Sequence, residues 1–284
     1  MDKLYFKMKN DAKQLKHNFF LALDNKQAKV LKKNNIYKNK YLGKRCFIIG
    51  NGPSLKHQDL SKTQDDMVFT VNMIPKSPMY TQLKSDFHVM ADPFIFQINM
   101  DKEEDREKLE TFKKINNEKS SPVCFFPYAG KEMIEKMGLN QFLNIAYIHF
   151  AGEFYEGYKK KIDLTKCIPG FCNVVQYAIE IAIYMGFREI YLLGCDMTGY
   201  EQISVLAGKE VELHAYEMNE NEKKAIQNTH SQIDPEAFFR GFYNMFTDYR
   251  RLYEYSEKRG IHIYNATQGG VLESLPRVDY NKLF

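Results

Sequence analysis

Short apolar runs alternate with helical stretches over most of this chain, and that alternation limits its possible folds more than any other feature. Seven runs rich in β-branched and aromatic residues look buried on both faces, at 45–50, 67–72, 86–92, 123–128, 146–150, 189–196 and 261–266. The clearest helical stretches are 173–185, followed by Gly186, and 235–258, followed by Gly260. The pattern predicts an α/β fold of Rossmann-like topology, with a mostly parallel sheet flanked by helices. The charged stretch 101–119 is expected to be a surface insertion.

The charge of the chain is unevenly distributed. Residues 1–45 hold 13 Lys/Arg and three acids, which leaves 27 basic and 33 acidic residues for the remainder. We therefore divide the chain into a basic helical arm, 1–40, and a main domain with the predicted Rossmann-like fold, 41–284. No nucleic-acid reader motif accompanies the lysines, so nucleic acid is not an expected partner.

Apolar residues recur at helical spacing among the lysines of the arm. They are Leu4, Leu15, Phe19, Phe20 and Leu23. Two interpretations stay open: the arm is an amphipathic helix that lies on an anionic membrane surface, or it packs on the body through these apolar residues.

The five cysteines indicate a reducing compartment. Their odd number and the apolar surroundings of four of them favour free thiols over a disulfide framework. Cys167 and Cys172 have no second Cys/His pair at zinc-ligand spacing, so a structural zinc is not expected. No apolar run reaches the roughly 18 residues of a membrane span, and no secretion signal is visible. We expect a cytoplasmic protein that the arm could hold at the inner face of the membrane.

The first predicted strand runs directly into a glycine turn. "RCFIIGNGPSLK" supplies Gly50, Asn51, Gly52 and Ser54 just after the apolar run. In an open α/β sheet, ligands bind at the carboxyl ends of strands, where such a turn lets backbone amides approach a phosphate. The turn is neither a dinucleotide fingerprint nor a Walker A loop. A tight turn with Ser54 as the N-cap of a helix is the structural alternative.

Polar residues also end other predicted strands. Asn72 and Asp92 close the second and third runs, and Gly194, Asp196, Thr198 and Tyr200 follow the sixth. These ends should share one edge of the sheet. Asn and Asp can bind ribose hydroxyls, a pyrimidine edge or a sugar, so a nucleotide or nucleotide-sugar is the expected ligand.

The sequence resembles two families. "NKYLGKRCFIIGNGPSL", "MGFREIYLLGCD" and "GIHIYNATQGGVLESLPRVDY" resemble the MptE-like proteins of surface-polysaccharide assembly, over about residues 38–284. The two strand-turn motifs are also similar to those of the bacterial Cst-type sialyltransferases, which use CMP-sialic acid. That second resemblance implies a glycosyltransferase A-like variant of the Rossmann-like fold.

The resemblance to the sialyltransferases implies roles for individual residues. Asn51, Gly52 and Ser54 would contact the nucleotide phosphate and ribose, Asn72 the donor, and Asp196 the cytidine ribose or the sugar. A hydroxyl-bearing turn of the sialyltransferases falls on residues 173–175. Its hydroxyls are absent here, although Asn173 could supply one hydrogen bond.

The resemblance also implies a histidine base in the segment after the 189–196 strand. Two histidines lie there, His214 in "ELHAYE" and His230 in "NTHSQID". We favour His214, because "HAYE" resembles a pattern of the MptE-like proteins. His88, His149 and His262 lie within predicted strands, where packing is the better interpretation, and His57 follows the glycine turn.

No Asp-x-Asp pair ends a strand, so metal-independent chemistry without a cofactor is expected. Tyrosine hydroxyls are then candidates for binding the leaving phosphate. The candidates are Tyr200, Tyr216 and Tyr243.

These inferences predict a glycosyltransferase that moves an acidic sugar from a CMP-activated donor to a glycan or lipid-linked glycan in surface-polysaccharide or lipopolysaccharide synthesis. One alternative is an MptE-like diphosphokinase that uses ATP and Mg²⁺ held by carboxylates such as Asp92 and Asp196. Against it, no Lys/Arg cluster is evident at the strand ends. The other alternative is a non-catalytic protein that binds nucleotide-sugars. The acceptor and the oligomeric state stay open.

Overall fold

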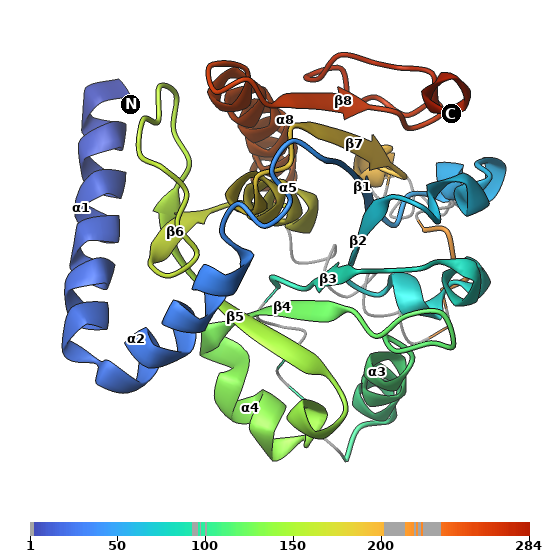
Figure 1. The fold of residues 1–284 in the computed structure, drawn as a ribbon, viewed down its shortest axis with the longest axis horizontal. Helices are drawn as coiled ribbons and strands as arrows, with labels where there is room; N and C mark the ends of the chain where they lie inside the picture. The colour runs from blue at the N-terminus through green and yellow to red at the C-terminus, as the bar shows by residue number, and fades with distance from the viewer. Residues whose placement is uncertain are drawn as a thin grey trace.

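A computed structural model describes residues 3–92, 96, 98–99, 101–201, 214–218, 220, 223 and 234–284. Its centre is an eight-stranded sheet in the order β6-β5-β4-β3-β2-β1-β7-β8, with every neighbouring pair parallel (Figure 1). The strands are β1 (Arg45–Ile49), β2 (Met67–Val71), β3 (Phe87–Val89), β4 (Val123–Pro127), β5 (Asn144–Glu153), β6 (Cys167–Gly170), β7 (Glu189–Leu193) and β8 (His262–Asn265).

Helices cover both faces of the sheet and one of its edges. They are α1 (Lys3–Leu23), α2 (Asn25–Lys32), α3 (Glu103–Lys113), α4 (Lys131–Lys136), α5 (Val174–Met185) and α8 (Pro235–Glu257). The sheet and its helices confirm the predicted α/β, Rossmann-like fold class.

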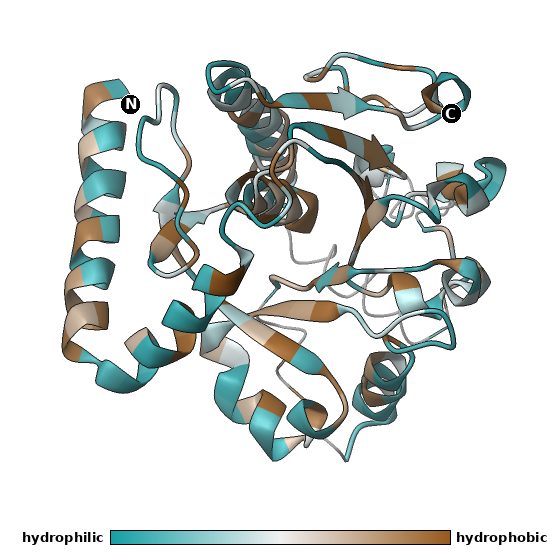
Figure 2. Cartoon of the chain, in the orientation of Figure 1, coloured by the Kyte–Doolittle hydropathy of each residue, from teal (hydrophilic) through white to brown (hydrophobic). Residues whose placement is uncertain are grey.

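Burial on both faces explains why the strands read as continuous apolar runs. In β1, Cys46 and Ile48 enter one hydrophobic cluster, whereas Phe47 and Ile49 enter another on the opposite face. Helix α5 packs against the first of these faces, and Figure 2 shows it as one of the most hydrophobic elements. It ends at Gly186, whose φ of 92° is the left-handed conformation that glycine adopts without strain.

Two features of the fold differ from the sequence prediction. Strand β6 was not predicted, because "CIPG" is short and contains a proline, which usually argues against a strand. The stretch 101–119 is more than a surface insertion, since Phe112 and Ile115 are fully buried in a hydrophobic cluster that also contains Phe126 of β4.

The order of the strands reverses beside β1. The chain passes from β1 to β2 on one side, continues outward to β6, and then returns through α5 to place β7 on the other side of β1. The carboxyl ends of β1 and β7 therefore flank the point where ligands bind in open α/β sheets.

Helix α1 packs on the sheet with its polar side. Asn10 accepts a hydrogen bond from the backbone N–H of Glu153 at 2.8 Å, and Asn18 accepts one from that of Cys167 at 2.9 Å. These side chains satisfy backbone donors of β5 and of the edge strand β6, which explains why amides face inward. Packing of the arm through its apolar residues is thus a wrong prediction. All five of them are more than half exposed: Leu4, Leu15, Phe19, Phe20 and Leu23.

All five cysteines are free, and Cys172 alone among them is exposed. Within the described residues, no helix is both long and apolar enough to cross a membrane.

Candidate functional site

The turns after β1 and β7 are joined by a short hydrogen-bond network. The N–H groups of Gly50 and Gly52 donate to the carbonyls of Leu193 and Gly194, both at 2.8 Å. Across the same junction, Asp196 accepts two bonds from Ser54, from its N–H at 3.2 Å and its hydroxyl at 2.8 Å.

Asp196 is a nearly buried carboxylate, 7% exposed. Burial raises its pKa, while the two hydrogen bonds from Ser54 and the charge of Arg277 act in the opposite direction. Because both of its oxygens already bind Ser54, Asp196 positions the β1 turn. Its predicted contact with a ribose or sugar would have to be made in addition to these bonds.

The glycines of the two turns allow a very close approach of the chains. A Cβ on Gly52 would overlap a carboxylate oxygen of Asp196 and lie 2.6 Å from its Cγ, and one on Gly194 would lie 2.5 Å from Leu55. A Cβ on Gly50 would overlap the carbonyl oxygen of Gly194. The packing of the two turns alone therefore requires glycine here, whether or not a phosphate binds.

Asn51 and Asn72 present two amide oxygens at the ends of adjacent strands. Ile49 pairs with Thr70 near the ends of the two strands, and Asn51 and Asn72 follow these ends within two residues. Neighbouring strands lie about 4.8 Å apart. The Oδ1 atoms of both asparagines are buried and have no hydrogen-bond partner among the residues that the structure describes. Buried acceptors of this kind are costly unless a partner fills them.

The segment that carries His214 passes over the same edge of the sheet. The Ala215 N–H donates to the carbonyl of Asn51 at 2.8 Å, and the Ala215 carbonyl accepts from the hydroxyl of Ser77 at 3.4 Å. The ring of His214 stacks on Tyr216, with centroids 4.9 Å apart. The structure thus brings His214 and Tyr216 close to the turn, whereas His230 lies outside the described residues.

The remaining predicted site residues occupy different positions. Asp92 is exposed just beyond β3. Asn173 caps α5 by accepting from the Val175 N–H at 2.8 Å. Thr198 accepts at its carbonyl from the Glu201 N–H, and the ring of Tyr200 packs against α8.

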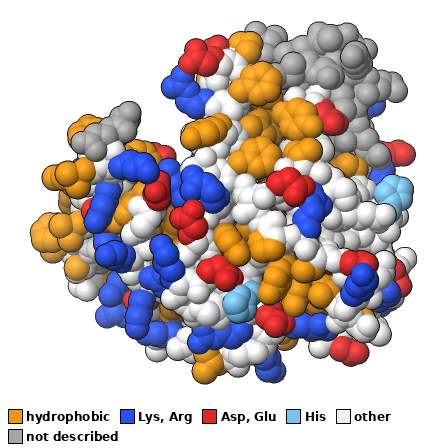
Figure 3. Space-filling view, turned by 90° about the horizontal axis from the view of Figure 1, so that it is seen from above, with side chains coloured by type: hydrophobic (Ala, Val, Ile, Leu, Met, Phe, Trp, Pro, Cys, Tyr) orange, Lys and Arg blue, Asp and Glu red, His pale blue; other side chains and the backbone are white. Residues whose placement is uncertain are grey.

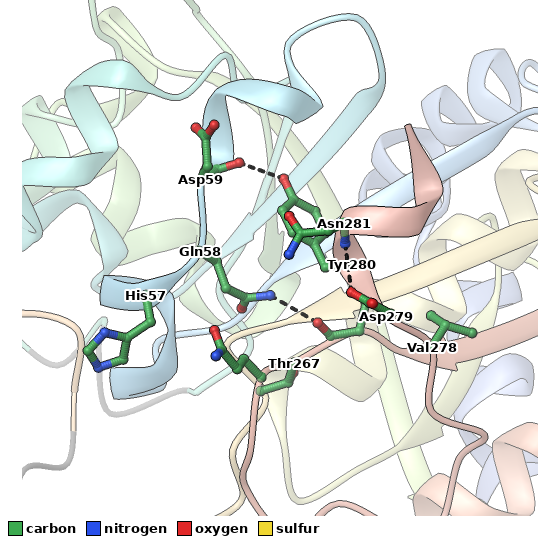
Figure 4. Close-up of a pocket in the computed structure, with 10 residues that line it drawn as sticks. His57, Gln58, Asp59, Thr267, Val278, Asp279, Tyr280 and Asn281 are labelled. Carbon is green, nitrogen blue, oxygen red and sulfur yellow. Dashed lines mark hydrogen bonds between the residues drawn. The ribbon is translucent and has the colours of Figure 1, made fainter.

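A pocket of about 240 Å³ opens beside the β1 turn. Figure 4 shows His57 and Gln58 on one side of it and Thr267, which follows β8, on another. The Gln58 amide nitrogen donates to the carbonyl of Ala266 at 2.9 Å, and its Oε1 atom is buried with no partner in the described part of the chain. Gln58 and Thr267 were not among the predicted site residues. The "ATQGG" stretch after β8, a further strand end with glycines, was the signal that could have found them.

The three histidines that lie in strands differ in their burial. His88 is fully buried, and its Nδ1 atom forms a 2.8 Å hydrogen bond with the hydroxyl of Thr70. Burial lowers the pKa of His88 to about 3. It is a core residue, as expected. His262 is exposed at the start of β8 and contacts Glu257 at 2.8 Å. His149 faces α1.

Comparison with known proteins identifies one family. The family model described as "6-hydroxymethylpterin diphosphokinase MptE-like" matches residues 13–202, which include the second half of α1 and strands β1–β7. This range begins earlier and ends earlier than the resemblance seen in the sequence. No curated protein matches the chain, so the resemblance to the Cst-type sialyltransferases gains no support. Because the match covers two thirds of the residues, the chain belongs to the MptE-like family.

Proposed function

We propose that this protein is a nucleotide-dependent diphosphokinase that acts on the hydroxymethyl group of a pterin-like ring. The family description names that activity, and the chain has the strand-end architecture that suits a nucleotide. In the reaction, the hydroxyl oxygen bonds to the β-phosphorus of ATP, the bond from that phosphorus to the bridging oxygen of the α-phosphate breaks, and AMP leaves. The hydroxyl proton passes to a base.

The observation that carries the proposal is the pair of unpartnered amide oxygens on Asn51 and Asn72. Acceptor oxygens require a ligand that presents N–H or O–H groups to both. The amino group and ring N–H of a pterin lie side by side and meet that requirement, and a ribose diol is a second solution. Strands β1 and β2 are direct neighbours in the sheet, which suits two contacts to one ring.

His214 is the proposed base. Its imidazole is held beside the turn by the contact of Ala215 with Asn51, and histidine exchanges protons near neutral pH. Gly50, Gly52 and Ser54 would then set the shape of the phosphate side of the site, while Tyr216 supports the histidine ring.

Magnesium does not fit between Asp92 and Asp196. Their strands β3 and β7 are separated by β2 and β1, which is three inter-strand spacings, or about 14 Å. Asp196 is also occupied by Ser54. A Mg²⁺ ion that enters with a triphosphate often needs one protein carboxylate in addition to phosphate oxygens and water, and Asp92 alone is exposed for that role.

Nucleotide binding and turnover together test the proposal. The protein is mixed with 6-hydroxymethyl-7,8-dihydropterin and with ATP, CMP, CDP, UDP or GDP, each with and without Mg²⁺, and thermal shift and AMP release are measured. We expect stabilisation by ATP and pterin, and AMP formation only when both are present. No AMP above the background of enzyme-free controls would refute the proposal.

Variants locate the activity. Asn51→Leu and Asn72→Gly remove the two amide oxygens, and glycine also accommodates the φ of 47° at position 72. We expect each to weaken pterin binding by at least about 10-fold, the cost of one lost hydrogen bond. Asn116→Ala, a loop variant remote from these strand ends, is the control. Equal affinity in all three would contradict the assignment.

Glycosyl transfer from a CMP-sugar is the second candidate. The observation in its favour is that the strand-end segments 50–54, 72–73, 90–92 and 194–198 contain no Lys or Arg to clamp a triphosphate. CMP binding without Mg²⁺ and CMP release from CMP-sialic acid would support it. Binding of a nucleotide-sugar without turnover would instead indicate a non-catalytic binding protein.

A further inference from the structure

Two histidines and a cysteine meet where α1 crosses β5 and β6, apart from the strand ends discussed above. His17 of α1 and His149 of β5 have ring nitrogens 3.1 Å apart. The Cys167 sulfur of β6 completes a group in which all three ligand atoms lie within 4.8 Å of one another. The side chains come from three different elements, so the packing of α1 on the sheet is what assembles the group.

We propose that His17, His149 and Cys167 bind a divalent transition-metal ion, with zinc the best match to their chemistry. Imidazole nitrogen and thiolate sulfur are the donors that zinc prefers, at about 2.0–2.1 Å and 2.3 Å. In a tetrahedral site such donors lie about 3.3–3.7 Å apart. The two histidine nitrogens already have nearly this spacing, and the sulfur has to approach by no more than about 1.5 Å.

The contacts around Cys167 do not explain why its thiol lies beside the two histidines. The Cys167 N–H is already satisfied by Asn18, and its thiol has weak backbone contacts, to the carbonyl of Ile168 at 3.7 Å and to Ala151. A hydrogen bond between His17 and His149 accounts for the pair of rings, but it gives no reason for the thiol beside them. Three protein ligands leave a fourth position for water, and a bound ion would fasten α1 to the edge of the sheet.

Metal binding to the whole chain tests this site, with Zn²⁺ and Co²⁺ as the probes. We expect one ion per chain after chelator treatment and reloading, and a thiolate-to-cobalt charge-transfer absorption in the Co²⁺ form. Cys167→Ser should abolish that absorption, whereas Cys172→Ser, which changes the one exposed cysteine, should keep it. His17→Gln should weaken Co²⁺ binding at least about 10-fold, and the exposed His262→Gln should not.

Several outcomes would overturn the inference. A folded parent that retains no ion after reloading would refute the site, and so would a Cys167→Ser protein that binds Co²⁺ with the same absorption as the parent. His17→Gln alters a partly exposed helix residue, so it keeps the test decisive if the buried cysteine variant does not fold. Unchanged Co²⁺ affinity in a folded His17→Gln protein would likewise refute the site.

A separate observation concerns the outward face of α1. At 100° per residue, one uninterrupted sector of this helix carries only apolar or small side chains and lies opposite the buried Asn10, Gln14 and Leu21. Six of its residues are more than half exposed: Leu4, Tyr5, Met8, Leu15, Phe19 and Leu23. Figure 3 shows hydrophobic side chains along the outer side of this helix, with Lys and Arg side chains beside them.

We infer that this face binds an anionic lipid surface. Lys9, Lys13 and Lys16 follow one flank of the apolar sector, as in helices that lie in the membrane interface. The only acid in α1 is Asp11, which pairs with Lys160 of the body. A second copy of the chain would bring two sets of these lysines together, so charge favours lipid phosphates over self-association.

Vesicle sedimentation tests this second inference. We expect the protein to pellet with phosphatidylcholine vesicles that contain about 30% phosphatidylserine, less in high salt, and hardly at all with phosphatidylcholine alone. The double change Leu15→Glu and Phe19→Glu should abolish pelleting. Phe239→Glu, on an exposed phenylalanine of α8, is the control. Failure of the parent to pellet, or a stable dimer that the double change dissociates, would overturn the inference.

Discussion

Gly52→Ala measures how closely the β1 and β7 turns approach each other. The backbone of Gly52 has φ −67° and ψ 151°, which alanine adopts without strain, so the cost of the change is steric. The new Cβ would overlap the Asp196 carboxylate and lie 2.7 Å from the carbonyl oxygen of Gly194. Asp196 would have to move away from Ser54 and lose one or both of its hydrogen bonds.

The magnitude follows from these contacts. A hydrogen bond to a charged group contributes about 1.5–3 kcal/mol, and overpacking costs about 1–3 kcal/mol. We therefore expect Gly52→Ala to lower the free energy of unfolding by about 3–5 kcal/mol, measured by urea denaturation. Gly241→Ala is the matched control. Nothing lies near a Cβ at this helical glycine of α8, so a gain of about 0.5–1 kcal/mol is expected.

A double-mutant cycle refines the test. Asp196→Ala removes the carboxylate that the new Cβ would meet, so Gly52→Ala should cost about 2 kcal/mol less in that background. The reasoning is refuted if Gly52→Ala stays within about 0.5 kcal/mol of the parent, or if the two changes are additive within that limit. Loss of stability would also mean that reduced nucleotide binding by a Gly52 variant is no measure of phosphate contact.

Further predictions concern pH, capping and thiol exposure. Burial raises the pKa of Asp248 to about 6, so its contribution to stability is present at low pH and is lost as the pH rises from about 4 through 6. Asp248→Asn should remove this pH dependence from the urea midpoints measured across that range. Burial lowers the pKa of His88 to about 3, so its contribution to stability is lost as the pH falls below about 6.5. His88→Gln should therefore reduce the fall of the urea midpoint at low pH. Asn173→Ala should cost about 1 kcal/mol in a urea titration, whereas Asn173→Asp, which keeps the capping oxygen, should cost little. A thiol reagent should label Cys172 alone in the folded protein, and rapid labelling of a second cysteine would contradict the described burial.

Periodicity predicted the fold well because each strand is buried on both faces. The run at 45–50 contributes Phe47 and Ile48 to opposite sides of the sheet, and no polar alternation was needed to recognise it. Strand β6 was not predicted because its four residues include Pro169 and because its pairing with β5 depends on tertiary contacts. The orientation of α1 also depended on such contacts. Its amides face inward because edge-strand N–H groups need acceptors, which helical spacing alone does not reveal.

The candidate site was predictable where it follows strand ends and unpredictable where distant residues meet. Asn51 and Asn72 were found because each follows an apolar run. Their position at the ends of two neighbouring strands and their unpartnered oxygens became visible only in the folded chain. The histidine and cysteine group was missed for a related reason: a search for short ligand spacing cannot connect residues 17, 149 and 167.

The position of β7 between β1 and β8 has a consequence for synthesis of the protein. The first half of the site, the glycine turn after β1, leaves the ribosome about 140 residues before β7 does. At about 5–20 residues per second, that interval is roughly 7–30 s. Throughout it one side of β1 has no strand to pair with, and Ser54 has no Asp196 to bind. A nascent chain that stops short of residue 196 should therefore carry the motif yet bind no nucleotide, and its open strand edge makes it a candidate for chaperone protection.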